Sequence, residues 1–174
     1  PELVYDSIGT VRRFCAEVEE DAVRAQMEAD RAVFELDPTL DEPTHAEAAR
    51  MYLGLRAYLQ SGGLSGYTLH YGECGEDGRF TQLPLLAASN LLADGYGYAA
   101  EGDSTAAVLV AAMQTLCGAA GFTEMYMMDF KREAILMCHQ GEGNWRLCRG
   151  DRRPYLKNRV LSEGGLSDPP TPIF

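Results

Sequence analysis

The first third of the chain repeats apolar residues at helical spacing. Between Asp6 and Phe34, valine, phenylalanine and methionine side chains return every three or four positions, and acidic residues fill the opposite face. This pattern predicts one amphipathic helix, in which Asp6 or Ser7 accepts hydrogen bonds from the free N–H groups of the first turn. Pro38 and Pro43 interrupt the pattern, so the next helix is expected to begin after them.

Helical and strand-like patterns then alternate as far as residue 120. Thr44 and Glu47 have the spacing of a capping box, and Gly62 and Gly63 end the helix that it starts. The predicted elements are a helix at 44–61, a strand at 64–71, a helix at 83–93, a strand at 96–100 and a helix at 104–117. The last helix is rich in Ala, Val and Leu, so much of its surface is expected to be buried. The alternation is typical of an α/β layer with a parallel sheet.

The pattern changes after Gly121. Four short strand-like segments follow at 122–130, 134–140, 144–149 and 156–161. Short strands joined by tight turns predict antiparallel β structure, and its methionines are expected to fill a core. We therefore expect two domains, one at 1–120 and the beginning of another at 121–174.

Composition and charge narrow the classes of partner. The chain carries 15 Lys and Arg against 26 Asp and Glu, a formal net charge of −11, which argues against nucleic acid or an anionic membrane as a partner. No apolar run approaches the roughly 20 residues that a membrane span needs. Five scattered cysteines without a Cys-x-x-Cys pair favour a reducing cytoplasm over a disulfide framework. The first residue is not Met, which favours a piece of a longer polypeptide.

Glu101, Glu124 and His139 are the candidate site residues, because each lies in or at the end of a segment predicted as a buried strand. An unpaired ionisable group is costly there, and two carboxylates with an imidazole most simply share a cation. Oxygen ligands with one imidazole suit Mn²⁺ or Mg²⁺ better than Zn²⁺. Each residue also has a structural alternative. Glu101 could stabilise a helix N-terminus, and Glu124 could pair with Lys131 or Arg132. His139 could be a satisfied core residue.

A series of motifs occurs in order in the middle of the chain. They are Leu83-Pro84, Ala93-Asp94-Gly95-Tyr96-Gly97, Glu101-Gly102-Asp103 and Phe122-Thr123-Glu124-Met125-Tyr126, with His139 after the next strand. In this order they resemble the L-arabinose isomerase family, within the wider group of L-fucose and L-arabinose isomerases. The similarity covers most of the chain and is densest from Leu83 to His139.

The resemblance implies a cytoplasmic, metal-dependent aldose–ketose isomerase. Its cofactor would be Mn²⁺ or another divalent cation, its substrate a small sugar such as an aldopentose, and its assembly a homo-oligomer. By motif position, Glu101, Glu124 and His139 would be metal ligands, and the two glutamates would also be the acid/base pair of an enediol mechanism. Patterns and resemblance together give the fold class as α/β, with a Rossmann-like parallel-sheet layer followed by part of an antiparallel β-barrel domain.

The chain departs from the family's pattern in three respects. No histidine follows His139 to supply the family's fourth ligand, because His45 and His70 precede the motif. Ser104 stands where the family has a tryptophan, and the family's N-terminal domain is missing. The chain alone is therefore expected to bind metal weakly and to be inactive. The departures keep open a non-catalytic sugar-binding or assembly module of the same fold and, as a weaker alternative, a metal-dependent hydrolase.

Overall fold

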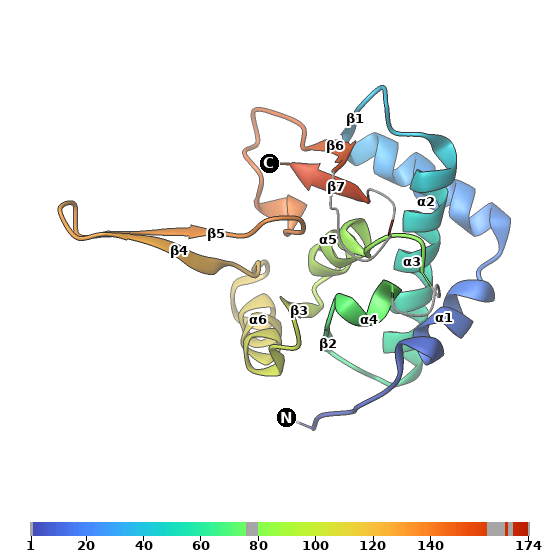
Figure 1. Cartoon of the computed structure of the whole chain (residues 1–174), viewed down its shortest axis with the longest axis horizontal. Coiled ribbons are helices and arrows are strands. Elements are labelled where there is room, and N and C mark those ends of the chain that lie inside the picture. The colour runs from blue at the N-terminus through green and yellow to red at the C-terminus, as the bar shows by residue number, and fades with distance from the viewer. Residues whose placement is uncertain (1, 76–79, 160–165, 167–168, 174) are drawn as a thin grey trace.

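Helices and strands alternate along the chain in this computed structural model, which describes residues 2–75, 80–159, 166 and 169–173 (Figure 1). The elements are α1 (Ile8–Ala16), α2 (Glu20–Val33), β1 (Glu35–Leu36), α3 (Glu42–Ser61), β2 (Gly66–Leu69), α4 (Gly72–Gly75), α5 (Leu85–Ala93), β3 (Gly97–Ala100), α6 (Ser104–Cys117), β4 (Glu124–Asp129), β5 (Ala134–Cys138), the 3₁₀ turn η1 (Trp145–Leu147), β6 (Tyr155–Asn158) and β7 (Pro170–Ile173). Within the described ranges, no helix has both the length and the apolar character needed to cross a membrane.

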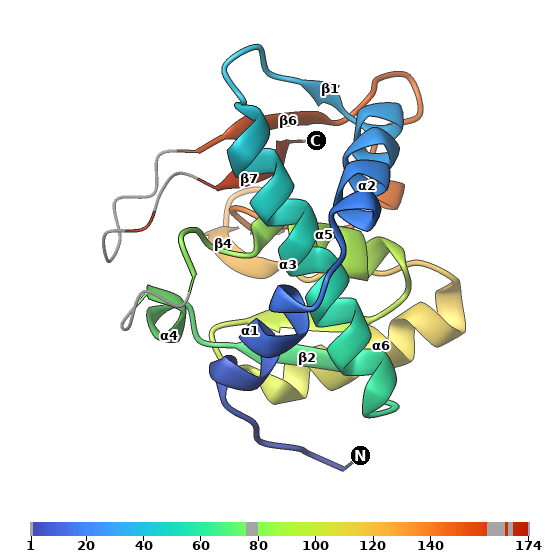
Figure 2. The same cartoon turned by 90° about the vertical axis from the view of Figure 1, so that its right-hand side faces the viewer.

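The long helix α3 is the centre of the helical part, and α1, α2 and α5 pack against it (Figure 2). It begins at Glu42 rather than Thr44, because the Asp41 side chain accepts a hydrogen bond from the Thr44 N–H at 2.9 Å. Helix α1 crosses α3 closely where Gly54 faces Cys15. A Cβ atom at Gly54 would lie 2.5 Å from the Cys15 sulfur, so this crossing requires glycine.

The single helix predicted from Asp6 to Phe34 is two helices, α1 and α2. The chain leaves helical geometry at Glu19, whose backbone is extended, and starts again at Glu20. Both helices bury their apolar faces against α3, through Cys15 in α1 and Met27 in α2. The break therefore lets each half of the predicted helix reach α3 separately.

Strands β2 and β3 form a parallel pair, in register from Gly66 opposite Gly97 to Leu69 opposite Ala100. Helix α6 crosses this pair closely, since a Cβ atom at Gly97 would lie 2.4 Å from the Ala107 carbonyl oxygen. The predicted α/β class is confirmed. In the described residues, however, this parallel layer is two strands wide.

Helix α6 begins and ends where the sequence predicts. The Asp103 side chain caps it by accepting a hydrogen bond from the Ala106 N–H at 2.8 Å. Its buried residues are Ala107, Val110 and Gln114. Leu116 is 78% exposed, so the expectation that much of the helix surface is buried was wrong. The two-stranded pair beneath α6 covers only one of its faces.

Strands β4 and β5 form an antiparallel hairpin that projects from the rest of the molecule (Figure 1). The side chains of Met125, Met127 and Met128 were expected in a core, but they are 54%, 58% and 49% exposed. This prediction was wrong because, within the described chain, no layer packs over the hairpin. The same exposure means that β4 and β5 are not buried strands.

The remaining sheet has the strand order β1-β6-β7, with β6 parallel to β1 and antiparallel to β7. The segment at 144–149, predicted as a strand, contains the 3₁₀ turn η1 instead. Its Trp145 ring packs edge-on against Phe34 at 6.3 Å, and its Nε1–H donates to Asn90 Oδ1 at 3.1 Å. These contacts direct the segment toward the core. The strands described after residue 121 lie in separate small sheets and do not form a barrel.

Candidate functional site

The base of the β4–β5 hairpin brings two of the predicted site residues together. Glu124 is the first residue of β4 and pairs in register with Cys138, the residue before His139. The Glu124 Oε2 and His139 Nε2 atoms are consequently 4.0 Å apart. The predicted alternative partner Arg132 is engaged elsewhere, in an ion pair with Asp129 at 3.0 Å.

The His139 ring is held on two sides. Phe122 packs against it edge-to-face, with ring centroids 4.8 Å apart. The Nδ1 atom lies 3.4 Å from the backbone oxygen of Glu142 and 3.8 Å from its carboxylate Oε2. With a side chain only 11% exposed, His139 is fixed at the edge of the interior rather than free in solvent.

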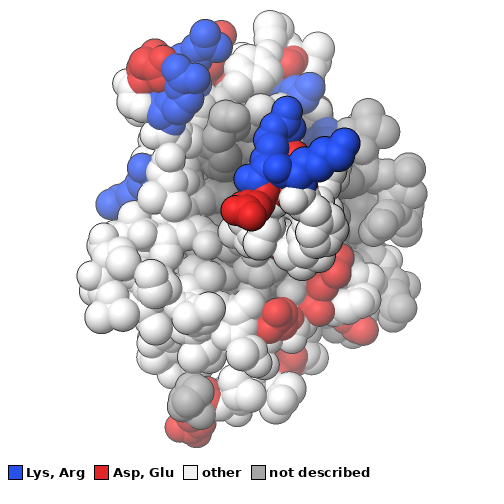
Figure 3. All heavy atoms as spheres, turned by 90° about the vertical axis from the view of Figure 1, so that its left-hand side faces the viewer, with Lys and Arg blue, Asp and Glu red and all other residues white. Residues whose placement is uncertain are grey.

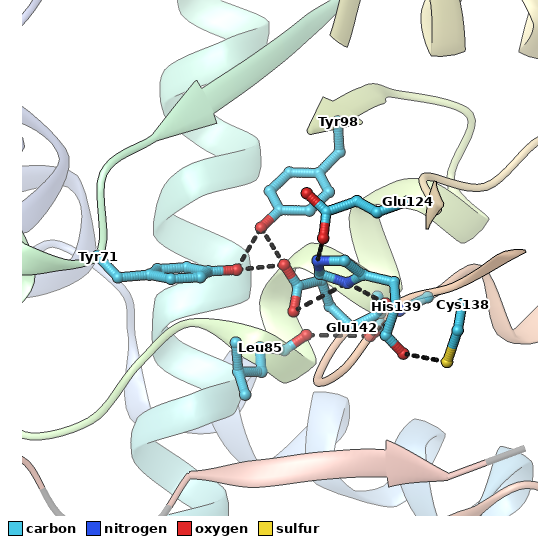
Figure 4. A network of polar contacts seen from close by, with 9 residues as sticks. Tyr71, Leu85, Tyr98, Glu124, Cys138, His139 and Glu142 are labelled. Carbon is cyan, nitrogen blue, oxygen red and sulfur yellow. Dashed lines mark hydrogen bonds and ion pairs between the residues drawn. The ribbon is translucent and has the colours of Figure 1, made fainter. Parts of the chain in front are cut away.

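Glu142 is a buried carboxylate that the sequence analysis missed. Its side chain is fully buried, and its Oε1 accepts hydrogen bonds from the hydroxyl groups of Tyr71 and Tyr98 (Figure 4). The two hydroxyl oxygens are 2.5 Å apart. Glu142 Oε2, on the His139 side, is buried and has no hydrogen-bond partner among the described residues. A buried acceptor without a hydrogen bond is costly, so Oε2 is free to accept a hydrogen bond from a further donor.

The pKa values of this cluster follow from its burial. Burial raises the pKa of Glu142, although the hydrogen bonds from Tyr71 and Tyr98 and the positive charge of a protonated His139 act in the opposite direction. Burial, together with the Glu142 charge, raises the pKa of both Tyr71 and Tyr98. The two phenols therefore remain protonated and serve Glu142 as donors.

His139 and Glu142 line a hollow of about 670 Å³. Lys157 and Arg159 contribute two cations to its wall, and Tyr126 an aromatic ring. Figure 3 shows the face from which the hairpin projects, where Lys and Arg side chains gather in the upper half. The volume suits a small molecule, and the mixture of charged and aromatic groups suits a polar one.

Glu101 is not grouped with Glu124 and His139. It follows β3 as an exposed turn residue in the left-handed backbone region, with φ 56°. Beside it, the Gly102 N–H donates to Thr68 Oγ1 at 3.0 Å. In the part of the chain that the structure describes, no three His, Cys, Asp or Glu side chains are placed to hold one metal ion. The structure thus brings together Glu124 and His139 but not Glu101.

The sequence offered one weak signal for Glu142 and none for its partners. Glu142 lies three residues after His139, but between Gly141 and Gly143 in a segment interpreted as a turn. Tyr71 and Tyr98 are 27 positions apart and meet near the parallel pairing of β2 with β3. Only that pairing, which the sequence does not specify residue by residue, identifies them as neighbours.

Comparison with known proteins assigns the chain to a family. The family model described as the L-arabinose isomerase central domain matches residues 3–119, more than half of the chain. The chain belongs to the L-arabinose isomerase family. The resemblance stated from the motifs is therefore confirmed.

Three relatives show how much of the family's length is present. The L-arabinose isomerase of Clostridium beijerinckii is 29% identical over 98% of this chain and 35% of its own length. The enzyme of Geobacillus thermodenitrificans is 32% identical over 96% of this chain and 34% of its own. The enzyme of Flavobacterium johnsoniae is 35% identical over 74% of this chain and 26% of its own. The chain thus spans between a quarter and roughly a third of these relatives.

Proposed function

We propose that this chain is part of a metal-dependent aldose–ketose isomerase that acts on L-arabinose or a related aldopentose. The family supports the reaction class, because its relatives carry the name L-arabinose isomerase. The observation that carries the proposal is the approach of Glu124 to His139, 4.0 Å apart, where His139 lines a hollow large enough for a sugar.

The proposed ligands of Mn²⁺ or another divalent cation are Glu101, Glu124 and His139. Carboxylate oxygens and one imidazole are donors that suit such a cation, and Glu124 and His139 already lie close together. Glu101 would join them from the turn between β3 and α6.

Glu101 and Glu124 are also the proposed acid/base pair. One carboxylate takes the proton from C2 of the aldose, the enediol forms, and a proton returned to C1 completes the ketose while the O2 hydroxyl proton passes to O1. The cation, when bound, polarises the sugar oxygens and stabilises their negative charge. His139 contributes a nitrogen lone pair and takes no part in the proton transfer.

We also propose a domain boundary, a homo-oligomeric assembly and a cytoplasmic location. The domain boundary near residue 120 is supported by the central-domain match, which ends at residue 119. Homo-oligomerisation is supported by the exposed apolar side chains of the hairpin and of α6, and sedimentation would test it. A cytoplasmic location is supported by five cysteines that are all free thiols.

The second candidate function is a non-catalytic sugar-binding or assembly module. It is favoured by the separation of Glu101 from the other two residues and by Ser104, which stands where the family has a tryptophan. In this alternative the hollow binds a sugar without a metal ion.

The test compares this chain with the same chain completed by the flanking segments of the Clostridium beijerinckii relative. Both are titrated calorimetrically with Mn²⁺ and assayed for ketose formation from L-arabinose. We expect tight metal binding and turnover in the completed chain, and weak binding without turnover in this chain alone. Absence of metal binding in both would favour the module, and ester or amide cleavage without isomerisation would favour a hydrolase.

Two substitutions test the acid/base pair in the completed chain. Glu101→Gln and Glu124→Gln should each lower kcat by about 10²-fold or more, because each removes an acid/base group. Glu133→Gln is the matched control, since Glu133 is an exposed glutamate at the hairpin turn and, like Glu101, has a left-handed backbone. Near-normal turnover in Glu101→Gln or Glu124→Gln would show that the acid/base assignment is wrong.

A further inference from the structure

The two ring nitrogens of His139 face different groups. Its Nε2 faces the carboxylate of Glu124 at 4.0 Å, and its Nδ1 faces Glu142 (Figure 4). Two oxygens of Glu142 lie on the Nδ1 side, the backbone oxygen at 3.4 Å and Oε2 at 3.8 Å. Both are acceptors and both lie closer to Nδ1 than the Glu124 carboxylate lies to Nε2, so the ring hydrogen of a neutral His139 is most favourable on Nδ1.

The Glu142 carboxylate cannot turn freely to offer either oxygen. Its Oε1 is engaged by the hydroxyl groups of Tyr71 and Tyr98, which come from the segment after β2 and from β3. The Glu142 side chain is fully buried, so bulk water does not reach its oxygens to donate a hydrogen bond. Oε2 is thereby left as the buried oxygen without a partner in the described chain, opposite Nδ1.

We propose that Tyr71 and Tyr98 are positioning residues that act through Glu142 to fix the tautomer and orientation of His139. They hold Oε1, so that Oε2 and the Glu142 backbone oxygen both face the Nδ1–H, and Nε2 is left without hydrogen toward Glu124 and the hollow. A neutral imidazole nitrogen in this state is the form that ligates a cation, so the proposal deepens, and in that respect rests on, the proposed role of His139.

Glu142→Gln gives the sharpest test because it nearly preserves shape. The two phenols need an acceptor, so the Gln oxygen takes the place of Oε1 and the NH₂ group takes the place of Oε2. That NH₂ group is a donor aimed at Nδ1, which favours the Nε2–H tautomer. The backbone oxygen of residue 142 still favours Nδ1–H, so we expect the tautomer population of His139 to shift measurably from Nδ1–H toward Nε2–H.

The tautomer is read by two-bond ¹H–¹⁵N NMR on the ¹⁵N-labelled chain, without metal and at a pH where histidine is neutral. His139→Gln assigns the signals among the three histidines. The double variant Tyr71→Phe, Tyr98→Phe should give a mixture of tautomers, because the carboxylate loses both donors. Tyr67→Phe is the matched control, since Tyr67 packs against Tyr98 at 5.1 Å but its hydroxyl makes no hydrogen bond among the described residues. It should leave the tautomer unchanged.

Three outcomes would overturn the proposal. They are an Nε2–H tautomer in the unaltered chain, an unchanged tautomer in a Glu142→Gln chain whose amide spectrum shows it is folded, and an unchanged tautomer in the folded double variant. Mn²⁺ affinity of the completed chain is a separate measurement, which Glu142→Gln should lower about 10- to 100-fold. If the tautomer population shifts but no chain binds Mn²⁺, the positioning role stands and the isomerase proposal fails. If Mn²⁺ binds and Glu142→Gln changes neither the tautomer nor the affinity, the positioning role fails alone.

Discussion

Among the described residues, two buried carboxylates lie next to histidines, and their surroundings differ. Asp30 of α2 meets His45 of α3, with Oδ2 and Nε2 2.9 Å apart and each side chain 2% exposed. The other Asp30 oxygen accepts from Asn90 of α5 at 3.1 Å and from Gln26 at 2.8 Å. No buried side-chain polar atom of these four residues lacks a partner in the described structure, so we call them the closed cluster.

The open cluster consists of Tyr71, Tyr98, Glu142 and His139. Its carboxylate and imidazole are 3.8 Å apart, one carboxylate oxygen lacks a partner among the described residues, and His139 borders the hollow. The closed cluster uses its bonding capacity to join α2, α3 and α5. In the open cluster, the bonding capacity of Glu142 Oε2 is not used by any described residue. Incomplete hydrogen bonding, rather than the presence of a buried histidine, therefore distinguishes the candidate site from a structural pair.

The largest expected effect is on stability, from breaking the closed cluster. Asp30→Ala leaves His45, Asn90 and Gln26 without their shared acceptor in the interior. Removing one member of such a buried pair should lower the free energy of unfolding by about 3–5 kcal/mol, measured by urea unfolding with circular dichroism. The His139 tautomer should not change in the folded variant.

The control is Asp21→Ala on the same helix, because Asp21 pairs with Arg24 on the exposed surface. Exposed ion pairs contribute about 0–1 kcal/mol, so this variant should unfold nearly as the unaltered chain does. Equal losses in the two aspartate variants would contradict the distinction between a closed buried cluster and an ordinary surface pair.

Substitutions of two neighbouring tyrosines should change the free energy of unfolding by smaller amounts and should differ from each other. Tyr98→Phe removes a hydroxyl that donates to buried Glu142, and should lower the free energy of unfolding by about 1–3 kcal/mol. Tyr67→Phe removes a buried hydroxyl that has no partner in the described chain, and should be neutral or stabilising. Thermal and urea unfolding of both variants measure the difference. Equal destabilisation by the two substitutions would contradict the hydrogen-bond assignment.

The sequence predicted elements well where local chemistry decides them. Helix α6, the turn between β4 and β5, and strand β3 all depend on residues close together in the chain. It failed for burial, because Met127 and Leu116 have the composition of core residues but lie on surfaces that nothing in the described chain covers. Apolar composition indicates what can be buried, not what is buried.

The candidate site shows the same limit. Glu124 and His139 are 15 positions apart, and an antiparallel hairpin with one register shift after Met125 joins them, so both motif and pattern pointed to them. Glu142 was overlooked because its partners Tyr71 and Tyr98 come from elsewhere in the chain. Burial of a carboxylate depends on such long-range packing, which local patterns do not encode.

The smallest expected effect is a pH dependence that separates the open cluster from the rest of the molecule. Burial raises the pKa of Glu142 above its ordinary 4.5. As pH rises through this value the unfolded chain releases its proton first, and the folded chain holds its proton until the raised pKa is passed. The stability that Glu142 contributes is therefore full below pH 4.5 and is lost as pH rises through the folded pKa.

Glu142→Gln removes this titration while it preserves the shape of the side chain. In metal-free buffer, the free energy of unfolding of the unaltered chain should fall relative to that of Glu142→Gln as pH rises from acid toward neutral. Urea unfolding at a series of pH values measures the difference, and Glu133→Gln, at the exposed hairpin turn, should show none. Parallel pH curves for the unaltered chain and Glu142→Gln would mean that hydrogen bonds from Tyr71 and Tyr98 offset the cost of burying the charge. Hydrogen bonds would then offset the cost of the buried charge in the open cluster as they do in the closed cluster. The two clusters would differ only in the unpartnered Oε2 of Glu142.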